Sequence, residues 1–271
     1  MGIQEELIKY SIKTVILIPV FNDEKGLIES MKYLDKLNPQ PTYYIFLENN
    51  SNDNTLNVIF NFKEKHSNTL IIRLWFREDT RYILGSPFAT IGLVKQILLE
   101  KVRRMDIDYA IFIDSDILIG DIDFITKVTE CKYDVLNKEI SSFDILGGAY
   151  YGMSFNGKKY LSALTKYKDN VIEHYLGIHE VYAVGGGCLC LSKKIIMDKR
   201  INFYPLIERR TFNQGELAVN TSEDFGYCFQ ATDNGYKCYL DNTLNIGHYK
   251  NEYYRAWTRI NGGYIDFEYP E

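Results

Sequence analysis

Short, uninterrupted apolar runs alternate with helical patterns through the first half of this chain. The apolar runs are Thr14–Phe21, Tyr43–Leu47, Leu70–Phe76 and Tyr109–Ile113. Apolar side chains recur at helical spacing over 25–37, 55–65 and 91–105. Runs without polar alternation are typical of strands that are buried on both faces of a sheet. The order of elements therefore predicts an α/β fold with a mostly parallel sheet and helices on both faces.

The second half of the chain is less regular and richer in glycine and tyrosine. Strands are expected over 144–151, 182–192 and 236–240, and a helix is expected to start near Glu223 and to stop at Asn234-Gly235. No proline-, glycine- or serine-rich linker separates the two halves. We therefore predict one domain over residues 1–271, with a mixed sheet in its second half.

Composition excludes several classes of protein. A formal net charge of -5 argues against a general nucleic-acid binder, and 14% aromatic residues argue against disorder. The five cysteines form no Cys-x-x-Cys pair, so we expect reduced thiols and no zinc site. The N-terminus has no signal-peptide pattern, and no apolar run approaches the roughly 18 residues of a spanning helix. A cytoplasmic protein without a transmembrane segment is expected, and peripheral membrane contact stays open.

Polar clusters follow three of the predicted strands, namely Asn22–Glu24, Glu48–Asn50 and Asp114–Asp116. In open parallel sheets, ligands bind beyond the carboxyl ends of the strands. The three clusters are therefore expected to meet at one edge of the sheet. The alternative is that they are separate, solvent-exposed loops.

Asp114 and Asp116 are the strongest local signal for chemistry. In an extended chain, alternate residues share a side, so both carboxylates are expected to face one way, with Ser115 opposite. Neighbouring carboxylates repel each other and favour a counter-cation, and oxygen ligands suit Mg²⁺ or Mn²⁺. The competing interpretation is a strand-end turn whose aspartates are solvated.

A second signal lies in the segment 221–249. Glu223 and Asp224 fall in the first turn of the predicted helix, and His248 follows 24 residues after Asp224. Acidic residues in a first turn also stabilise the helix dipole, and a single histidine is often a hydrogen-bonded structural residue. A catalytic and a structural interpretation both remain open at this stage.

Two other segments are less specific. Gly185–Gly187 follows an apolar run, so it allows close approach to a ligand or simply forms a tight turn, and it lacks the Gly-Lys-Ser/Thr of a P-loop. The tyrosine-rich residues 249–269, which include Trp257, are expected to pack on the domain or to form a lid.

In combination, these segments resemble the glycosyltransferases of the GT-A (Rossmann-like) fold, in particular the family-2-type group. The matching motifs occur in the family's order and span most of residues 14–250. They are the opening strand with Pro19–Asn22, the turn Glu48–Thr55, the Asp-x-Asp motif Asp114–Asp116, the Glu-Asp helix Ser222–Phe225 with a later Gly235-Tyr236, and Gly247-His248.

The chain departs from that pattern at three places. Glu48-Asn49 stands where the family usually has two acids, and Asn50 replaces a glycine. The usual Arg-Asn pair is not evident on the predicted helix before the Asp-x-Asp strand. Arg81 and Lys95 are the nearest basic candidates, and either is compatible with a surface position.

The resemblance implies a reaction and a cofactor. The donor would be a nucleotide diphosphate sugar, with UDP favoured and GDP next, and the acceptor a hydroxyl on a glycan or glycolipid. Asp114, Asp116 and His248 would hold Mn²⁺ or Mg²⁺, which stabilises the leaving diphosphate. Asp224 would be the general base of an inverting transfer. The resemblance also suggests a place in polysaccharide biosynthesis.

The resemblance also assigns binding residues. Residues 14–120 would form a nucleotide-binding half, 121–250 an acceptor and catalytic half, and 251–271 a tail or lid. Glu223 and Trp257 would contact the acceptor. The residues implied for the nucleotide sugar are Pro19, Val20, Phe21, Asn22, Glu48, Asn50, Arg81, Asp114, Ser115, Gly186 and Gly187.

Three alternatives stay open. A retaining GT-A transferase has similar motifs, and an inactive homologue would keep only nucleotide or carbohydrate binding. A haloacid-dehalogenase-type phosphatase also has an Asp-x-Asp strand like Ala110–Leu118, but there the motif lies near the N-terminus and a different pattern follows it.

Overall fold

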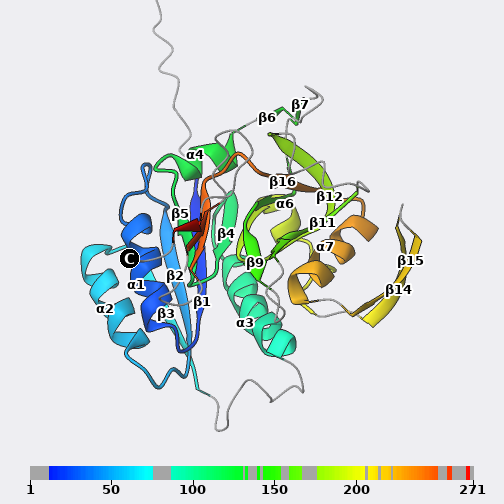
Figure 1. The fold of residues 1–271 in the computed structure, drawn as a ribbon. Helices are drawn as coiled ribbons and strands as arrows, with labels where there is room; N and C mark the ends of the chain where they lie inside the picture. The colour runs from blue at the N-terminus through cyan, green and yellow to red at the C-terminus, as the bar shows by residue number, and fades with distance from the viewer. Residues whose placement is uncertain are drawn as a thin grey trace, which may run out of the picture.

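The computed structural model has an α/β fold built around a large sheet (Figure 1). The residues that it describes are 12–75, 87–130, 132–133, 139–140, 143–153, 159–166, 176–204, 207–212, 215–220, 222–249, 255–257 and 267–268.

The centre of the fold is a nine-stranded sheet with the order β11-β12-β16-β8-β13-β4-β1-β2-β3. Its first four strands are β1 (Thr14–Val20), β2 (Tyr43–Asn49), β3 (Thr69–Leu74) and β4 (Tyr109–Ile113). These four are parallel to their neighbours within the set, with β1 between β2 and β4. The predicted parallel first half is confirmed, and the carboxyl ends of all four strands lie at one edge.

The second half of the chain extends this sheet with both parallel and antiparallel strands. Its strands are β8 (Ile145–Gly148), β11 (Ala163–Thr165), β12 (Ile178–Val184), β13 (Cys188–Ser192) and β16 (Cys238–Asp241). Strand β13 runs antiparallel to β4 and β8, whereas β16 runs parallel to β8. The expected mixed half is confirmed. The expectation of one strand over 182–192 is wrong, because the glycines 185–187 divide it into β12 and β13.

A smaller four-stranded sheet joins distant parts of the chain, with the order β19-β18-β17-β5. Its strands are β5 (Ile117–Ile119), β17 (Ile246–Tyr249), β18 (Arg255–Trp257) and β19 (Phe267–Glu268). The described residues also form three two-stranded pairs: β6 (Lys132–Tyr133) with β7 (Glu139–Ile140), β9 (Tyr151–Met153) with β10 (Lys159–Leu161), and β14 (Ile207–Phe212) with β15 (Gly215–Asn220).

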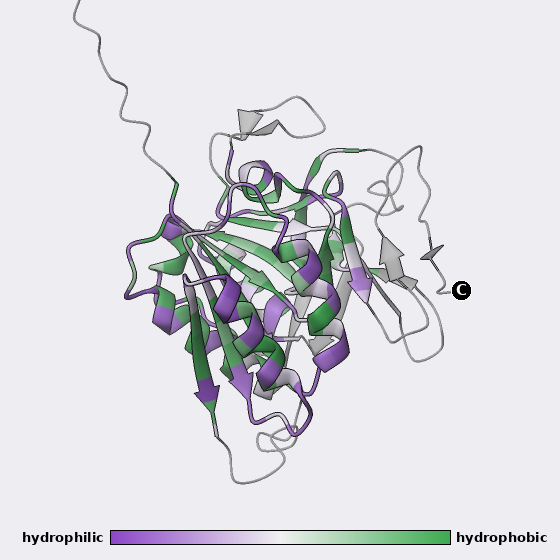
Figure 2. Ribbon diagram, turned by 90° about the vertical axis from the view of Figure 1, so that its left-hand side faces the viewer, coloured by the Kyte–Doolittle hydropathy of each residue, from purple (hydrophilic) through white to green (hydrophobic). Residues whose placement is uncertain are grey.

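Helices cover both faces of the large sheet, as the sequence predicted (Figure 1), and the strands between them are mostly hydrophobic (Figure 2). The described helices are α1 (Glu24–Leu34), α2 (Thr55–Lys65), α3 (Pro87–Val102), α4 (Phe124–Thr129), α6 (Lys193–Ile196) and α7 (Glu223–Asp233). Leu17 of β1 packs into the cluster that contains α3, α6 and α7, whereas Ile16 packs into the cluster with α1, α2 and α4. Alternate residues of one strand thus fill opposite cores.

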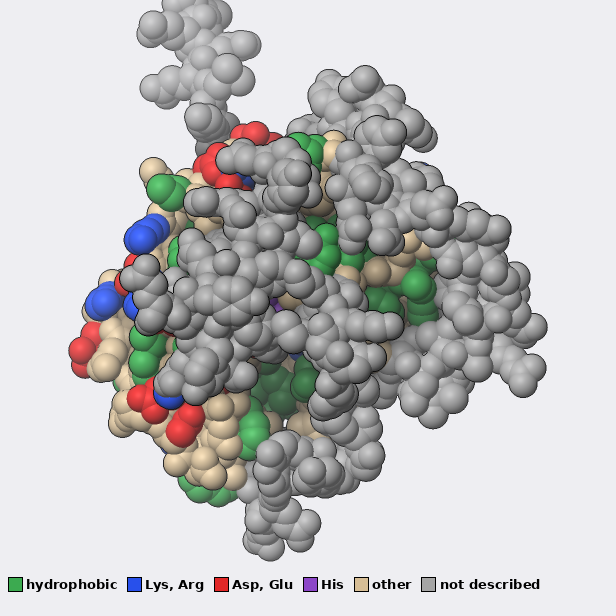
Figure 3. Space-filling view, viewed as in Figure 1, with side chains coloured by type: hydrophobic (Ala, Val, Ile, Leu, Met, Phe, Trp, Pro, Cys, Tyr) green, Lys and Arg blue, Asp and Glu red, His purple; other side chains and the backbone are tan. Residues whose placement is uncertain are grey.

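The cysteines within the described residues lie in the protein core. Cys188, Cys190, Cys228 and Cys238 are buried free thiols, and Cys131 lies outside the described residues. Within the part of the chain that the structure describes, no helix has the length and apolar character needed to cross a membrane. Acidic and basic side chains are interspersed on the side formed by α1 and α2 (Figure 3).

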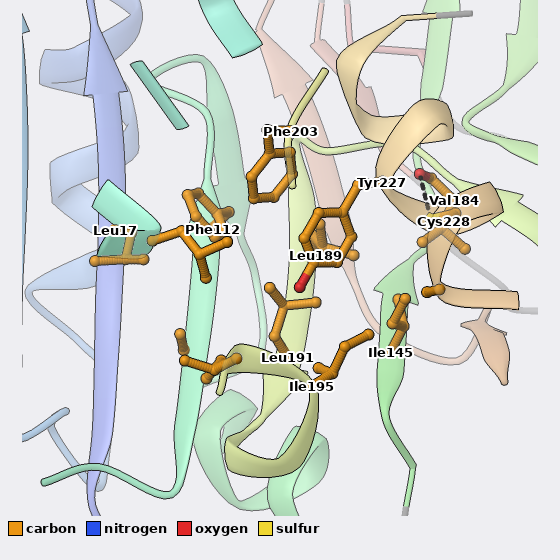
Figure 4. Close-up of a cluster of buried hydrophobic side chains, with 14 of the residues drawn as sticks. Leu17, Phe112, Ile145, Val184, Leu189, Leu191, Ile195, Phe203, Tyr227 and Cys228 are labelled. Atoms are coloured by element: carbon orange, nitrogen blue, oxygen red, sulfur yellow. Dashed lines mark hydrogen bonds between the residues drawn. The ribbon is translucent and has the colours of Figure 1, made fainter. Parts of the chain in front are cut away.

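Tyr227 of α7 marks the centre of one core cluster (Figure 4). Its ring stacks on Phe203 at a centroid distance of 4.3 Å, and Phe203 contacts Phe112 of β4 edge-to-face at 5.0 Å. The Tyr227 hydroxyl is buried without a hydrogen-bond partner among the described residues. By contrast, the buried Tyr44 hydroxyl donates to Gln40 Oε1 at 2.8 Å. An unpaired buried hydroxyl costs free energy, so the ring of Tyr227 stabilises this core and its oxygen does not.

We predict that Tyr227→Phe leaves the free energy of unfolding unchanged or raises it by about 1 kcal/mol, since an unsatisfied polar atom is removed. Tyr44→Phe is the matched control and should lower it by about 1 kcal/mol, because that hydroxyl is hydrogen-bonded. Urea unfolding of the three proteins measures both changes. Equal destabilisation by the two substitutions would contradict this account of Tyr227.

Candidate active site at the carboxyl ends of the central strands

Asn22 and Asn50 shape the loops that follow β1 and β2. Both have the left-handed backbone conformation, with φ values of 46° and 54°. The Asn22 amide donates to Ser51 Oγ at 3.0 Å, and Asn22 Oδ1 accepts from the Asn52 amide at 2.7 Å. Asparagine tolerates this conformation better than most residues other than glycine. The backbone therefore accounts for an asparagine at position 50, where the resembling family has glycine.

Glu48 is fully buried at the end of β2. Its Oε1 accepts from the Ser51 amide, and its Oε2 lies 3.2 Å from Arg73 Nε. The Arg73 guanidinium in turn lies 5.2 Å from the ring centroid of Trp75, whose surface is 72% exposed. Both oxygens of Glu48 are thus engaged by the chain itself. Sequence analysis did not single out Arg73 or Trp75, because neither falls in a motif.

The Asp114–Asp116 segment is a turn at the end of β4 rather than an extended strand. The Ile117 amide donates to the Asp114 carbonyl at 3.0 Å, which closes a four-residue turn. The expectation that pleating alone sets the directions of Asp114 and Asp116 is therefore wrong. Ser115 Oγ donates to Asp23 Oδ2, and Asp23 also caps α1 through the Gly26 amide. The end of β1 thereby holds the turn after β4.

His248 lies beside Asp116, although 132 positions separate them in the sequence. Its Nε2 is 3.2 Å from Asp116 Oδ2, and its Nδ1 is 2.9 Å from the Tyr151 carbonyl oxygen. Strand β17 brings it there, since it pairs with β5 directly after the turn and places His248 opposite Ile117. The Tyr249 amide also donates to the Asp116 carbonyl at 2.7 Å.

The donor chemistry of this pair fits a divalent cation. The Tyr151 carbonyl can only accept, so Nδ1 of His248 carries a proton there. Nε2 faces an acceptor oxygen of Asp116, and this contact is attractive only with a proton or a metal ion between them. Metal-binding histidines usually donate their other ring N–H to a carbonyl or carboxylate in this way. However, no group of three His, Cys, Asp or Glu within the described ranges is arranged to hold a metal ion.

Asp114 faces Lys95 instead. Lys95 Nζ lies 3.5 Å from Asp114 Oδ1 and 3.0 Å from Glu223 Oε1, and the lysine is 1% exposed. A Cβ at Gly186 would lie 2.3 Å from the same nitrogen, so glycine leaves the room that the ammonium needs. The possible surface position of Lys95 is therefore wrong: α3 carries this side chain into a cluster of acids between β4 and α7. A lysine within the apolar stretch 93–99 was the signal available in the sequence.

One buried ammonium group thus faces several carboxylates. Burial lowers the pKa of Lys95, but the charges of Asp114, Glu223 and Asp224 outweigh it, and the net shift is upward. Burial raises the pKa of Glu223 to about 7, with a further rise from Asp224 and an opposing effect of Lys95. Burial likewise raises the pKa of Asp114, again opposed by Lys95. One ammonium thus faces three acids, and burial favours the protonated form of two of them, Glu223 and Asp114.

Asp224 is held by donors on both carboxylate oxygens. Gly186 N–H donates to Oδ2 at 2.7 Å, while the Ser222 hydroxyl and the Phe225 amide at 2.8 Å donate to Oδ1. The neighbouring Gly187 amide donates to the Tyr150 hydroxyl at 3.0 Å. The tight turn between β12 and β13 therefore fixes the direction of the Asp224 side chain.

The remaining predicted residues are placed as follows. Pro19, Val20 and Phe21 lie at the end of β1, next to the loop that contains Asn22. Trp257 pairs in the backbone with Gly247 of β17, and its side chain lies outside the described residues. Arg81 also lies outside them. Contacts between side chains and backbone thus connect the loops after β1, β2 and β4, and Lys95 connects the last of them to the start of α7.

No protein-family model matches the sequence, and no curated protein matches it. Solved structures are similar to this chain at low sequence identity. GalNAc-T7 with UDP, GalNAc and Mn²⁺ has a TM-score of 0.52 and 15% identity, over 89% of this chain and 44% of that chain. S. aureus TarS 1-349 with UDP-GlcNAc has a TM-score of 0.51 and 16% identity, over 84% and 55%. A197 from STIV has a TM-score of 0.49 and 14% identity, over 96% of each chain.

The chain aligns with about half the length of GalNAc-T7 and of TarS 1-349 (44% and 55%). At sequence identities of 15% and 16%, these structural similarities establish the fold and nothing about activity. The protein therefore has the α/β fold of GT-A-type glycosyltransferases, with a large mixed sheet between helices.

We predict that the free energy of unfolding of the wild type falls, relative to that of Glu223→Gln, as the pH rises from 4.5 to 7. A carboxyl whose pKa is raised by folding stabilises the fold while it is protonated in both states, and this contribution disappears as the pH passes its folded pKa. The relative loss should reach up to about 3 kcal/mol. Urea unfolding at both ends of this range measures it, with Glu130→Gln on the surface as control. Parallel stability curves for wild type and Glu223→Gln would contradict the prediction.

Proposed function

We propose that this chain is a metal-dependent glycosyltransferase that moves a sugar from a nucleotide diphosphate sugar to a hydroxyl of a glycan or glycolipid. The observation that carries the proposal is the meeting of Asp116 with His248 and of Glu223 with Lys95 at one edge of this sheet. UDP is the favoured nucleotide, and GDP is next. The interspersed surface charges and the net charge of -5 give no support to a nucleic-acid partner.

In this proposal, Asp116 and His248 would hold Mn²⁺ or Mg²⁺, while Asp114, the third ligand expected from the sequence, faces Lys95 in this arrangement. When bound, such an ion supplies positive charge that stabilises the diphosphate leaving group. The Tyr151 carbonyl accepts from Nδ1 and leaves Nε2 facing Asp116, and β5–β17 pairing keeps the imidazole beside the turn.

The nucleotide sugar would lie against the loops after β1, β2 and β4, in the half formed by residues 14–120. The proposed contacts are Pro19, Val20, Phe21, Asn22, Glu48, Asn50, Asp114 and Ser115, with Gly186 and Gly187 beside the sugar. The left-handed Asn22 and Asn50 give these loops a defined shape before any ligand arrives. Arg81 remains a proposed contact on sequence grounds.

Asp224 would accept the proton of the acceptor hydroxyl in an inverting transfer. The donors from Gly186, Ser222 and Phe225 hold its carboxylate in one direction, which suits a group that must meet a hydroxyl at a fixed point. A positioned base contributes roughly 10²–10⁴-fold to a rate. Glu223 and Trp257 are proposed to orient the acceptor in the half formed by 121–250.

A thermal-shift screen of nucleotide sugars, with and without Mn²⁺, tests the proposal. A donor at 100 times its dissociation constant should stabilise the fold by about 2.7 kcal/mol, and only with the metal. Absence of any shift, together with turnover of simple phosphate esters, would favour a phosphatase instead.

We predict that His248→Ala weakens Mn²⁺-dependent binding of the best nucleotide by at least about tenfold, because one metal ligand and its oriented imidazole are lost. Isothermal titration measures the change. His66→Ala is the control, since His66 contacts Asp35 between α1 and α2. Unchanged affinity in His248→Ala would remove this residue from the proposed metal site.

We predict that Asp224→Asn lowers the transfer rate by roughly 10²–10⁴-fold and leaves Mn²⁺-dependent nucleotide binding near wild type. Asp233→Asn, at the other end of α7, should leave both unchanged. Transfer assays with the donor found in the screen measure the rate. A variant that transfers sugar at the wild-type rate would refute the assignment of the base.

A further inference from the structure

The charges at the ends of β4 and α7 fall into two groups. On one side, Asp116 lies 3.2 Å from His248 Nε2. On the other, the Lys95 ammonium lies 3.0 Å from Glu223 and 3.5 Å from Asp114, and Asp224 adds its charge to the same cluster. The Asp114–Asp116 turn therefore has one carboxylate in each group.

Lys95 is a buried residue of the protein core and not a surface lysine. It is 1% exposed, and Gly186 lies so close above it that a Cβ there would reach within 2.3 Å of Nζ. Burying an ammonium without partners is costly, so its position depends on the carboxylates around it. These acids are equally the kind of oxygen ligand that Mn²⁺ and Mg²⁺ prefer.

We propose that Lys95 is a positioning residue that acts as an internal cation, confining the divalent ion to the Asp116–His248 side and keeping it away from Glu223 and Asp224. This inference rests on the proposed function, since it concerns where the metal of that reaction binds. A divalent ion drawn toward α7 would meet the ammonium and be repelled by it. Asp224 consequently stays available to an acceptor hydroxyl.

The inference predicts an unusual result for a charge-removing variant. Lys95→Met takes the competing cation out of a cluster with several carboxylates. Mn²⁺ should then bind about tenfold more tightly in the absence of any nucleotide, because a neighbouring charge at such distances changes ionic affinities by one or more powers of ten. A residue that only supports the fold would give weaker binding when removed.

The experiment is a Mn²⁺ titration followed by electron paramagnetic resonance of the free ion, on wild type and Lys95→Met. Lys127→Met is the matched control, because it removes the same charge from a pair with Asp121 and Asp123 outside the site. Tighter binding by Lys95→Met alone supports the inference. Equal or weaker binding overturns it.

If Lys95→Met does not fold, a second pair of variants tests the inference. Glu223→Gln removes one acid, so the double variant Lys95→Met/Glu223→Gln keeps less unbalanced buried charge than Lys95→Met. It should bind Mn²⁺ more tightly than Glu223→Gln alone, and equal affinity would overturn the inference. Mn²⁺ binding by wild type with UDP or GDP is measured in parallel. If wild type binds no Mn²⁺ with either nucleotide, the proposed metal-dependent function itself is refuted. If wild type binds Mn²⁺ but the Lys95 substitution does not change the affinity, only the inference about Lys95 is refuted.

Discussion

The ion pairs of a single buried lysine connect the parts of this site. Lys95 from α3 reaches Glu223 at the start of α7 and Asp114 at the end of β4, so one ammonium fixes a helix and a strand that are far apart in sequence. Removing one partner of such a buried set is usually strongly destabilising, because the remaining charges lose their compensation. The Gly185–Gly187 turn is adapted to the same lysine, since Gly186 provides space for its nitrogen and an amide for Asp224.

The nucleotide side of the proposed site is organised by hydrogen bonds between loops. Asn22 and Asp23 after β1 contact Ser51, Asn52 and Thr55 after β2, and Asp23 also accepts from Ser115 after β4. Three strand ends are thus tied together without a ligand. A preorganised site of this kind loses less conformational entropy when a ligand binds.

Sequence analysis predicted the fold well where patterns are local. The helix over 55–65 and the strand over 109–113 have the predicted bounds, since continuous apolar runs and helical spacing report burial directly. It also named Asp116 and His248, because the family resemblance links motifs that no local pattern connects. It gave the turn at Asp114–Asp116 only as the alternative to an extended strand, and it did not predict the buried position of Lys95. Both depend on tertiary partners, namely Asp23 for the turn and Glu223 for the lysine.

The pairing of β17 with β5 has a consequence for how the protein is made. His248 reaches Asp116 only when β17 pairs with β5. Strand β5 leaves the ribosome long before β17, because it lies more than 100 residues earlier in the sequence. A partly synthesised chain that ends before residue 246 contains the sequence of the parallel strands β1 to β4 but lacks the imidazole. The contact between His248 and Asp116 therefore forms only after residues 246–249 have joined β5 in the smaller sheet.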